Sequence, residues 1–534
     1  MIDEILTQEL DEGWSKKEFE QIDLKDKRLN ERLITVSEQF SSNPGAPINQ
    51  ACETWKDIKA AYRLFDNEKV TGNEILEPHQ KRTVERMKGQ KIVLALQDTT
   101  YYNYDNHKKN KNMGSIGKTK SKTNEYTHLG LIMHSTLAST TTGLPLGLLS
   151  LEIWPREEKE KISKEAYKKL PIEKKESYKW VKAFKKTEEM KPEETRVVTV
   201  CDREGDVYEF FVEAREVEGE ILIRASRDRN LSNKEALLEI TDLVIEKLEN
   251  NIPQAKIKTL QNLKDKRLSR KELDDMLKEL SFTKNEINIV ANHANKKTRK
   301  LWEYMESQPL AGNIKIDIPK KEKSPERIAI LEVRYGEVTL DPPLHRKKFE
   351  KEKMGSVTID AVLVKEIGAP PDVEPLEWML LTNVSVKNYR DALDRIKWYK
   401  CRWNIEVYHK IIKSGCKVED CRLQTKERLV PYIVLFSIIS WRLFWMTKIN
   451  REEPESPCTA ILGPHEWKAL YAKIHSTDKL PEKLPTVRQA IRWIGQLGGF
   501  LGRKGDKEPG ITAIWRGWER LQDFAQMWLV LKTC

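Results

Sequence analysis

The sequence predicts an α/β protein in which a sheet of mixed strand direction lies between helical regions at the two ends of the chain. Short apolar runs at residues 91–97 and 196–201 are typical of buried strands. Residues 1–90 and the chain beyond 386 instead show the apolar spacing of helices. Over 196–224, strand, loop, helix and strand follow one another, and this order indicates a sheet with helices packed on it.

The composition excludes several classes of protein. The 534 residues carry 94 Lys and Arg against 83 Asp and Glu, a net charge of +11 that is compatible with nucleic-acid binding. Since 33% of the residues are charged and the first residues are acidic, we expect no membrane partner and no signal peptide. Seven cysteines without regular spacing exclude a disulfide framework and fit a reducing cytoplasm.

The remaining elements are expected from apolar runs separated by polar, Gly-rich or Pro-rich breaks, with no internal repeat. We expect helices over 1–90, a strand at 91–97, a loop over 105–124, strands at 127–137 and 144–153, charged helices over 155–195, a strand at 196–201, a helix from 204, a strand at 220–224, helices over 230–310, strands over 312–385, and helices at 387–414, 429–446 and 511–531. The run at 429–446 contains Pro431 and Arg442, so we expect a buried core helix there rather than a membrane span, which needs about 20 apolar residues.

Each of the two buried strands is predicted to deliver an aspartate at its carboxyl end, Asp98 and Asp202. Open α/β sheets commonly place their chemistry at this edge. Mg²⁺ prefers carboxylate oxygens, and two such ions can stabilise the attacking and leaving oxygens of a phosphoryl transfer. Strand-end capping is the alternative role of these aspartates, and a metal site requires a third carboxylate.

The helix expected over 387–414 supplies a third carboxylate, Glu406. At about 100° per residue, its stripe of polar side chains, about 60° wide, contains Tyr399, Arg402, Glu406 and Lys413. One interpretation is a solvated helix surface with ordinary charge pairs. The other is a site in which the carboxylate holds metal and its neighbours hold phosphates.

These four residues have the spacing Y-(2)-R-(3)-E-(6)-K, and the chain resembles the insertion-sequence-four family of DDE transposases. Asp98 in LQDTT resembles the first catalytic aspartate of that family, Asp202 in VCDREGDVY the second, and Glu406 the glutamate. The resemblance implies an RNase H-like core with a strand-rich insertion before its last catalytic helix. It also implies that the three acids bind two Mg²⁺ ions, for which Mn²⁺ substitutes.

The resemblance assigns further side chains to DNA. Tyr399, Arg402 and Lys413 are expected to contact phosphates, and so is Arg224 at the end of ILIR. Trp378 in PLEWMLLTN resembles the tryptophan that stacks on a base flipped out near the transposon end, with an ordinary core role as the alternative. The residues expected to bind the transposon end are Lys27, Arg28, Arg32, Lys56, Lys59 and Arg63.

The resemblance also implies a helical N-terminal DNA-binding domain and a helical C-terminal dimerisation domain. LGGF at 497–500 and WRGWE at 515–519 resemble the dimerisation segment. Residues 1–90 have 14 basic and 18 acidic side chains, a net charge of −4, so the cations that bind DNA must share one surface. The expected domains are 1–90 for end binding, 91–230 for the first part of the core, 231–385 for a helical and then strand-rich insertion, 386–450 for the last part of the core, and 451–534 for dimerisation.

The implied activity is cut-and-paste transposition, with nicking, hairpin formation by the 3′-hydroxyl, hairpin opening and strand transfer. The expected partners are double-stranded DNA, as inverted-repeat ends and as target, and a second copy of the chain in a synaptic homodimer. The expected location is a bacterial cytoplasm, in association with the nucleoid. Two alternatives remain: a structure-specific RNase H-like nuclease that cuts without joining, and a non-catalytic DNA-binding inhibitor, against which the three acids argue.

Overall fold

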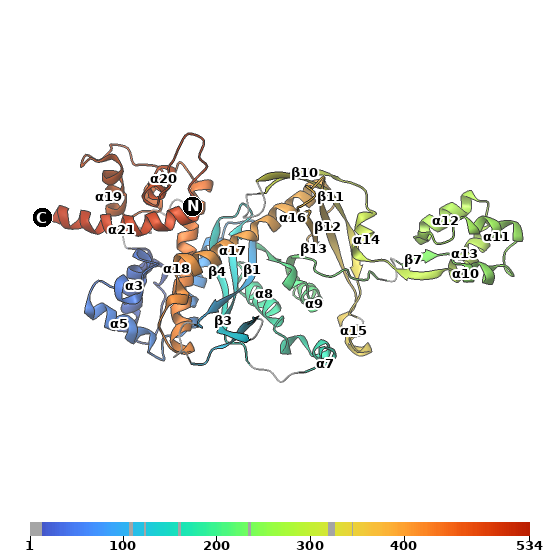
Figure 1. The fold of residues 1–534 in the computed structure, drawn as a ribbon, viewed down its shortest axis with the longest axis horizontal. Coiled ribbons are helices and arrows are strands. Elements are labelled where there is room, and N and C mark those ends of the chain that lie inside the picture. Colours follow the sequence, from blue (N-terminus) through green and yellow to red (C-terminus); the bar gives the residue numbers. More distant parts are fainter. Residues whose placement is uncertain are drawn as a thin grey trace. The chain divides into compact units, whose positions relative to one another are not determined.

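The computed structural model describes residues 13–105, 111–121, 124–157, 162–232, 236–318, 326–343 and 345–533. These residues fall into two compact units. Unit 1 contains residues 1–163, 178–200 and 397–534, and unit 2 contains residues 164–177 and 201–396. The chain therefore passes between the units more than once (Figure 1).

The N-terminal part of unit 1 is helical, as the sequence predicts. Asp26 begins the second of its helices by accepting a hydrogen bond from the backbone N–H of Arg28, an ordinary N-cap. The helices are α2 (Trp14–Glu18), α3 (Lys27–Ser42), α4 (Ile48–Ala51), α5 (Trp55–Phe65) and α6 (Gly72–Met87).

The sheet of unit 1 is mixed, as predicted. Its strands are β1 (Ile92–Asn103), β2 (Gly114–Lys120), β3 (Glu125–Thr140), β4 (Pro145–Trp154) and β5 (Arg196–Cys201). β1 pairs in parallel with β5 and antiparallel with β3, which also pairs antiparallel with β2 and β4. Helix α8 (Tyr178–Met190) packs against β1, β3 and β4, so the apolar runs of these strands are buried.

Two predictions about this sheet are wrong. Asp98 does not follow its strand, because β1 continues to Asn103 through its pairing with β3. The parallel pairing with β5 does end at Leu96 and Val200, so Asp98 still lies just beyond the part of β1 that runs beside β5. The loop predicted over 105–124 instead contains β2, although residues 106–110, 122 and 123 lie outside the described residues.

The long helix predicted over 387–414 consists of three consecutive helical segments. They are α16 (Tyr389–Cys401), α17 (Trp403–Lys410) and a π-helical turn over Ile411–Gly415. Arg402 lies at the junction between α16 and α17. A π turn accommodates one more residue than an α turn and is frequent at functional sites. The turn contains Lys413, so it changes the direction in which this residue leaves the helix axis relative to a regular α-helix.

Helix α18 (Lys426–Glu452) is the central helix of unit 1. It packs against α3, α5 and α6, against β4, and against the C-terminal helices α20 (Val487–Leu497) and α21 (Ile511–Thr533). Phe40 of α3 stacks with Phe65 of α5 and with Phe436 of α18, and Tyr432 of α18 contacts both phenylalanine rings edge-on. Among the described helices, α18 alone is long and apolar enough to cross a membrane, and 89% of its most apolar window is buried, as predicted for a core helix.

The C-terminal region contains α19 (Pro464–His475), α20 and α21, whose close approach requires two glycines. A Cβ atom at Gly498 would lie 1.8 Å from the carbonyl oxygen of Ala513, and one at Gly517 would lie 1.7 Å from that of Ile494. Any other residue at 498 or 517 would therefore force these helices apart.

Unit 2 is built around an antiparallel sheet, which confirms the strands predicted over 312–385. Its order is β10-β11-β12-β13-β6, and helix α14 (Leu301–Glu306) packs on β11 and β12. The strands are β6 (Glu220–Arg224), β10 (Gly312–Ile318), β11 (Arg327–Leu340), β12 (Val357–Ile367) and β13 (Glu377–Thr382). The other helices are α7 (Lys164–Lys169), α9 (Tyr208–Glu216) and α15 (Lys348–Met354).

The chain between β6 and α14 forms a separate small module. It contains a three-stranded sheet of order β8-β7-β9 and two pairs of helices. The elements are β7 (Ala236–Glu239), α10 (Asp242–Leu248), α11 (Gln254–Gln261), β8 (Arg267–Leu268), α12 (Arg270–Glu279), α13 (Lys284–His293) and β9 (Asn295–Thr298). The helices predicted over 230–310 are thus confirmed, whereas the small sheet was not expected.

A buried ionic cluster joins α2 to α6 and β4. Glu18 binds Arg86 through both carboxylate oxygens, each at 2.9 Å, and also binds Nδ1 of His79. Nε2 of His79 accepts the backbone N–H of Leu148 at 2.9 Å, so its proton is on Nδ1 and the ring is neutral. Burial raises the pKa of Glu18, but Arg86 and His79 outweigh burial and hold it well below its ordinary value. Burial lowers the pKa of His79.

Both shifts predict that acidification destabilises unit 1. Unfolded His79 takes up a proton below its ordinary pKa of 6.5, which the folded ring does not, so stability falls as the pH drops through this value. The contribution of Glu18 is lost at lower pH, below its ordinary pKa of 4.5. Denaturant unfolding at pH 7.5, 6 and 5 measures this loss.

Glu18→Gln should lower the free energy of unfolding at pH 7.5 by about 3 to 5 kcal/mol, because it leaves Arg86 buried without its partner. Glu20→Gln, at an exposed position two residues away, is the matched control and should change it by less than about 0.5 kcal/mol. Stability that stays constant or rises between pH 7.5 and 5 would contradict this account of the cluster.

Candidate active site and nucleic-acid interface

Helix α17 and the π turn after it make polar contacts with β1 and β3 of the unit 1 sheet. At its start, the Arg402 guanidinium pairs with the Glu406 carboxylate and lies 4.0 Å from Oδ2 of Asp98 on β1. Asp98 and Glu406 are thereby brought to the same cation from elements over 300 residues apart in the sequence. The structure therefore brings these two acids and the arginine into one cluster.

Arg402 compensates the repulsion between the two carboxylates. It also lies over the ring of Tyr399, with 5.9 Å between its Cζ atom and the ring centroid. Burial lowers the pKa of Arg402, but Tyr399, Glu406 and Asp98 outweigh burial and raise it above its ordinary value. The guanidinium therefore stays charged between the acids, as guanidinium groups do in proteins.

A buried histidine makes the second contact of α17. Nε2 of His409 lies 2.8 Å from Oγ of Ser135 on β3, and Nδ1 lies 3.9 Å from Oδ2 of Asp98. Burial, Lys413 and Arg402 lower the pKa of His409 to about 3, so the ring is neutral. His409 therefore positions α17 and adds no charge beside Asp98.

The third contact lies in the π turn. Nζ of Lys413 donates to the carbonyl oxygen of Tyr101 on β1 at 2.9 Å and lies 3.7 Å from Oε1 of Glu419. The Glu419 carboxylate also accepts the backbone N–H of Asn103 at 2.7 Å, at the end of β1. Lys413 is thus held beside the outer half of β1. Its partner Tyr101 lies five residues beyond Leu96, where the pairing of β1 with β5 ends.

The donor atoms of this cluster suit a hard divalent cation. Asp98 and Glu406 offer carboxylate oxygens, which Mg²⁺ and Mn²⁺ prefer. In the described parts of the chain, however, no three His, Cys, Asp or Glu side chains lie close enough together to hold a metal ion. In this arrangement the Arg402 guanidinium supplies positive charge between the two acids.

The other predicted core residues belong to unit 2. Asp202 directly follows β5 and begins a short 3-10 turn, where its Oδ1 accepts the backbone N–H of Glu204 at 2.8 Å. This is the strand-end capping role that the sequence left open. Arg224 ends β6 and donates to the carbonyl oxygen of Glu377, next to Trp378 on β13. Trp378 is half-buried and pairs in register with Val364, so two predicted DNA contacts lie on neighbouring strands.

The predicted cations of the N-terminal region lie on α3 and α5. On α5, Lys56, Lys59 and Arg63 are exposed and follow one another at intervals of three and four residues, which places them on one side of the helix. Nζ of Lys59 lies 5.0 Å from the ring centroid of Trp55, which is 68% exposed. On α3, Lys27 and Arg28 are exposed and Arg32 is half-buried.

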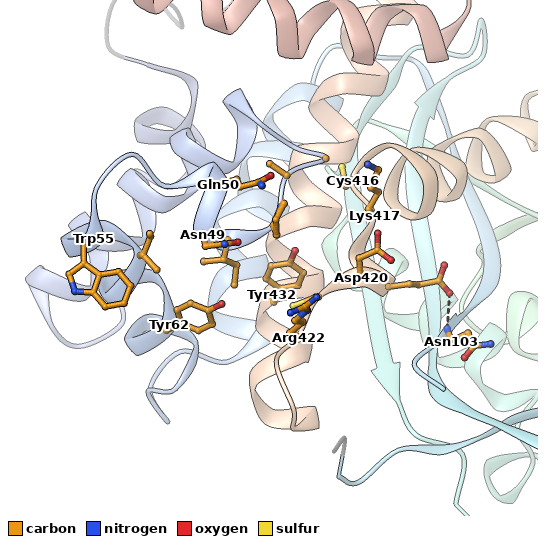
Figure 2. Close-up of a pocket in the computed structure, with 17 residues that line it drawn as sticks. Asn49, Gln50, Trp55, Tyr62, Asn103, Cys416, Lys417, Asp420, Arg422 and Tyr432 are labelled. Carbon is orange, nitrogen blue, oxygen red and sulfur yellow. Dashed lines mark hydrogen bonds between the residues drawn. The ribbon is translucent and has the colours of Figure 1, made fainter. Parts of the chain in front are cut away.

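A pocket of about 990 Å³ lies between α5 and the chain that follows the π turn (Figure 2). Trp55 and the exposed Tyr62 line it from α5, and Asn103 lines it from the end of β1. Lys417 and Arg422 contribute the cations from the opposite wall. Most of these pocket residues have no local signal in the sequence, because their meeting depends on how distant segments pack. The local signal is the occurrence of an aromatic residue next to a basic one at Trp55-Lys56 and at Tyr62-Arg63.

The C-terminal helix α21 ends in exposed apolar side chains. Met527 is 58% exposed and Leu531 is 67% exposed, although both lie on a helix that otherwise packs against α19 and α20. An apolar helix end of this kind is typical of a surface that contacts another protein.

Two protein-family models match this chain. Residues 11–70 match a family described as transposase DNA-binding, and this range contains α2 to α5 with all the predicted end-binding cations. Residues 438–528 match the family described as the transposase Tn5 dimerisation domain, and this range contains most of α18 and the helices α19 to α21. The DNA-binding and dimerisation domains predicted at the two ends of the chain are therefore both present.

Proposed function

We propose that this chain, whose two end domains support a Tn5-like transposase, is a cut-and-paste DNA transposase. It binds the inverted-repeat ends of a transposon, cleaves them by metal-dependent hydrolysis with a hairpin intermediate, and joins the 3′ ends to target DNA. One observation carries the proposal: Asp98 of β1 meets the Arg402–Glu406 pair of α17 in a chain that has transposase end domains.

Asp202 is proposed as the third catalytic acid, in an RNase H-like core. The strand register supports it, because Leu96 pairs in parallel with Val200, and each is followed two residues later by an aspartate. Aspartates in equivalent places on neighbouring parallel strands are suited to sharing a ligand.

Asp98, Asp202 and Glu406 would hold two Mg²⁺ ions, with Mn²⁺ as a substitute. Bound metal would supply the Lewis acid that stabilises the attacking and leaving oxygens at a scissile phosphate. Arg402 neutralises Asp98 and Glu406 in this structure, and its planar fork suits a phosphate once these acids have another cationic partner. Tyr399 lies against Arg402 and limits the directions in which the guanidinium can turn.

Positively charged and aromatic side chains would guide the DNA. Lys413 and Arg224 are proposed phosphate ligands, the first beside β1 and the second at the end of β6. The exposed cations of α5 would bind the transposon end, and the pocket beside α5 would take the backbone that continues from it. A homodimer would assemble through the C-terminal domain when both ends are bound.

Glu406→Gln tests the catalytic part of the proposal. The substitution keeps the size of the side chain but removes its charge, so we predict loss of Mg²⁺-dependent cleavage by at least about a hundredfold with end binding retained. Cleavage of end-containing DNA and electrophoretic mobility shift measure the two properties. Glu452→Gln, at an exposed position on α18, is the matched control and should cleave at the wild-type rate.

Cleavage at the wild-type rate by Glu406→Gln would contradict the proposed role of the glutamate. The wild-type protein should also join pre-cut ends to a target plasmid. Cutting without joining would identify a structure-specific nuclease, and end binding with neither reaction would identify a DNA-binding inhibitor.

Trp378→Ala tests the proposed base-stacking role. A strand must bend sharply to form a hairpin, and stacking on an aromatic ring compensates for the base that leaves the helix, at about 1 to 3 kcal/mol per base. We predict a hairpin yield lowered by about tenfold or more with first-strand nicking spared, and partial recovery in Trp378→Phe. Denaturing gels resolve the two products, and an unchanged hairpin yield in Trp378→Ala would refute the role.

A further inference from the structure

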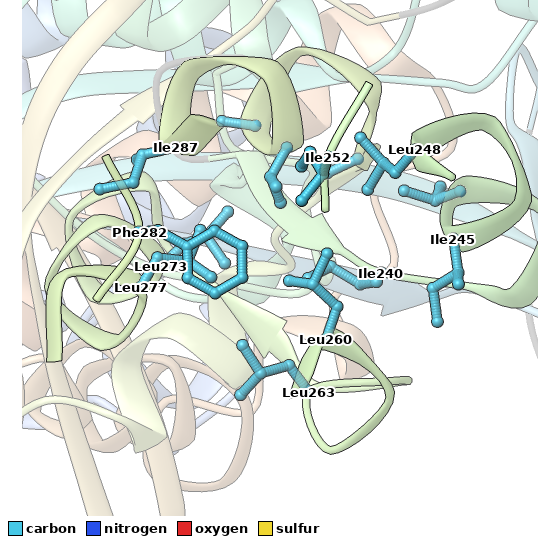
Figure 3. Close-up of a cluster of buried hydrophobic side chains, with 14 of the residues drawn as sticks. Ile240, Ile245, Leu248, Ile252, Leu260, Leu263, Leu273, Leu277, Phe282 and Ile287 are labelled. Atoms are coloured by element: carbon cyan, nitrogen blue, oxygen red, sulfur yellow. The ribbon is translucent and has the colours of Figure 1, made fainter. Parts of the chain in front are cut away.

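The small module of unit 2, residues 236–298, has its own hydrophobic core. Side chains from all four of its helices meet in one buried cluster (Figure 3). The members include Ile245, Leu248, Ile257, Leu260, Leu273, Leu277, Phe282, Ile287 and Val290. The fold of the module therefore rests on this core, and its surface side chains can take part in binding.

The module is built from two copies of a helix–helix–strand unit, although the sequence shows no evident repeat. Residues 253–260 and 283–290 have the same order of exposed, half-buried and buried positions. Lys256 and Glu286, thirty residues apart, form an ion pair with 2.6 Å between Nζ and Oε2. Arg267 and Lys297, also thirty residues apart, both pair with Glu239 on the central strand β7. Equivalent residues of the two copies thus face each other.

Several cations in the Lys- and Arg-rich segments 264–270 and 296–300 form ion pairs with acidic side chains. Lys264 pairs with Asp242 at 2.7 Å, Arg267 pairs with Glu239, and Arg270 pairs with Asp274 at 2.7 Å. Lys297 and Arg299 likewise pair with Glu239 and Glu272. Five cations of these charge runs therefore have acidic partners within unit 2.

The second helix of each copy presents a different surface. Its exposed positions at intervals of four residues carry only amides and lysines: Gln254, Lys258 and Asn262 on α11 and its end, and Lys284, Asn288 and Asn292 on α13. The one acid of these two helices, Glu286, is occupied by Lys256 and by the cap at Thr283. Most exposed acids of the module lie instead on α10 and α12, the first helix of each copy: Asp242, Glu246, Glu272, Asp275 and Glu279; the exposed Glu249 and Asp265 lie in the connections after α10 and after α11.

We propose that α11 and α13 form a second DNA-binding surface, separate from the Asp98–Glu406 cluster and from the N-terminal domain. Lysines on such a surface neutralise phosphates, and asparagine or glutamine side chains donate to and accept from base edges in the major groove. Asn288 is pre-oriented for this role, because its Oδ1 accepts a hydrogen bond from Arg270 of α12 at 2.6 Å. The proposal rests on the proposed function only in that DNA is the partner.

The helical arrangement suits a DNA duplex. Four residues, 280–283, connect α12 to α13, and both helices begin with a capping box, at Ser269 and at Thr283. Two helices joined by a short turn are a common way to place the second helix in the major groove. No acidic side chain is exposed on α11 or α13, whereas α10 and α12 each carry exposed acids, so the second helices are the more favourable side for a polyanion.

Salt-dependent DNA binding by the full-length chain tests this proposal. The test variant is Lys258→Gln with Lys284→Gln, and the matched control is Lys247→Gln with Lys278→Gln, two exposed lysines on the first helices. Fluorescence anisotropy with a random-sequence duplex of 30 base pairs, without divalent metal, gives affinity from 50 to 200 mM salt. The test variant should bind several-fold more weakly than the wild type, and its slope of log affinity against log salt should be smaller by about 2.

The control variant should match the wild type in both affinity and slope. Equal slopes for the test variant and the wild type would overturn the proposal, as would an equal loss in both variants. Circular dichroism and thermal unfolding confirm that the exposed substitutions leave the fold intact. Cleavage of end-containing DNA is measured separately, so an inactive wild-type protein would refute the proposed function while a smaller salt slope would still support this surface.

Discussion

The attachment of α17 across β1 and β3 is the constraint on which the candidate active site depends. Arg402, His409 and Lys413 each join this helix or its π turn to the sheet, at Asp98, Ser135 and Tyr101. These contacts, together with the buried Ile405 and Tyr408 of α17, hold Glu406 near an aspartate located 308 residues earlier in the chain. In this cluster the two acids share the charge of one arginine.

Helix α18 connects this site to the end domains. It contacts α3 and α5, which carry the proposed end-binding cations, and α20 and α21, which belong to the dimerisation domain. Most residues of α18 from Leu429 to Met446 are buried, so these elements contact the helix through packed side chains. Elements of both end domains and the π turn that follows α17 thus pack against one central helix of unit 1.

The sequence predicted correctly the structural features that local residue patterns determine. The buried strands, the helical ends and the stripe around Glu406 all follow from apolar periodicity and residue spacing, and the structure brings Asp98, Arg402 and Glu406 together. It did not predict features that depend on strand pairing or on departures from regular helix geometry. The extension of β1 beyond Asp98 depends on β3, and the π turn shifts Lys413 away from the regular helical position. Neither effect leaves a local signal.

The pocket beside α5 and the duplicated module were missed for a related reason. Tyr62 and Arg422 are 360 residues apart and meet only in the folded chain. The two copies of the module share a pattern of burial but few identical residues, so the duplication is evident only from ion pairs such as Lys256–Glu286.

The central claim is that Asp98 and Glu406 bind the divalent metal that the proposed reaction requires. Anomalous diffraction from crystals of the protein with Mn²⁺ and transposon-end DNA tests this claim most directly. The account predicts an anomalous peak in contact with carboxylate oxygens of Asp98 and Glu406, which disappears in Glu406→Gln. No peak at these side chains, or an unchanged peak in the variant, would contradict it.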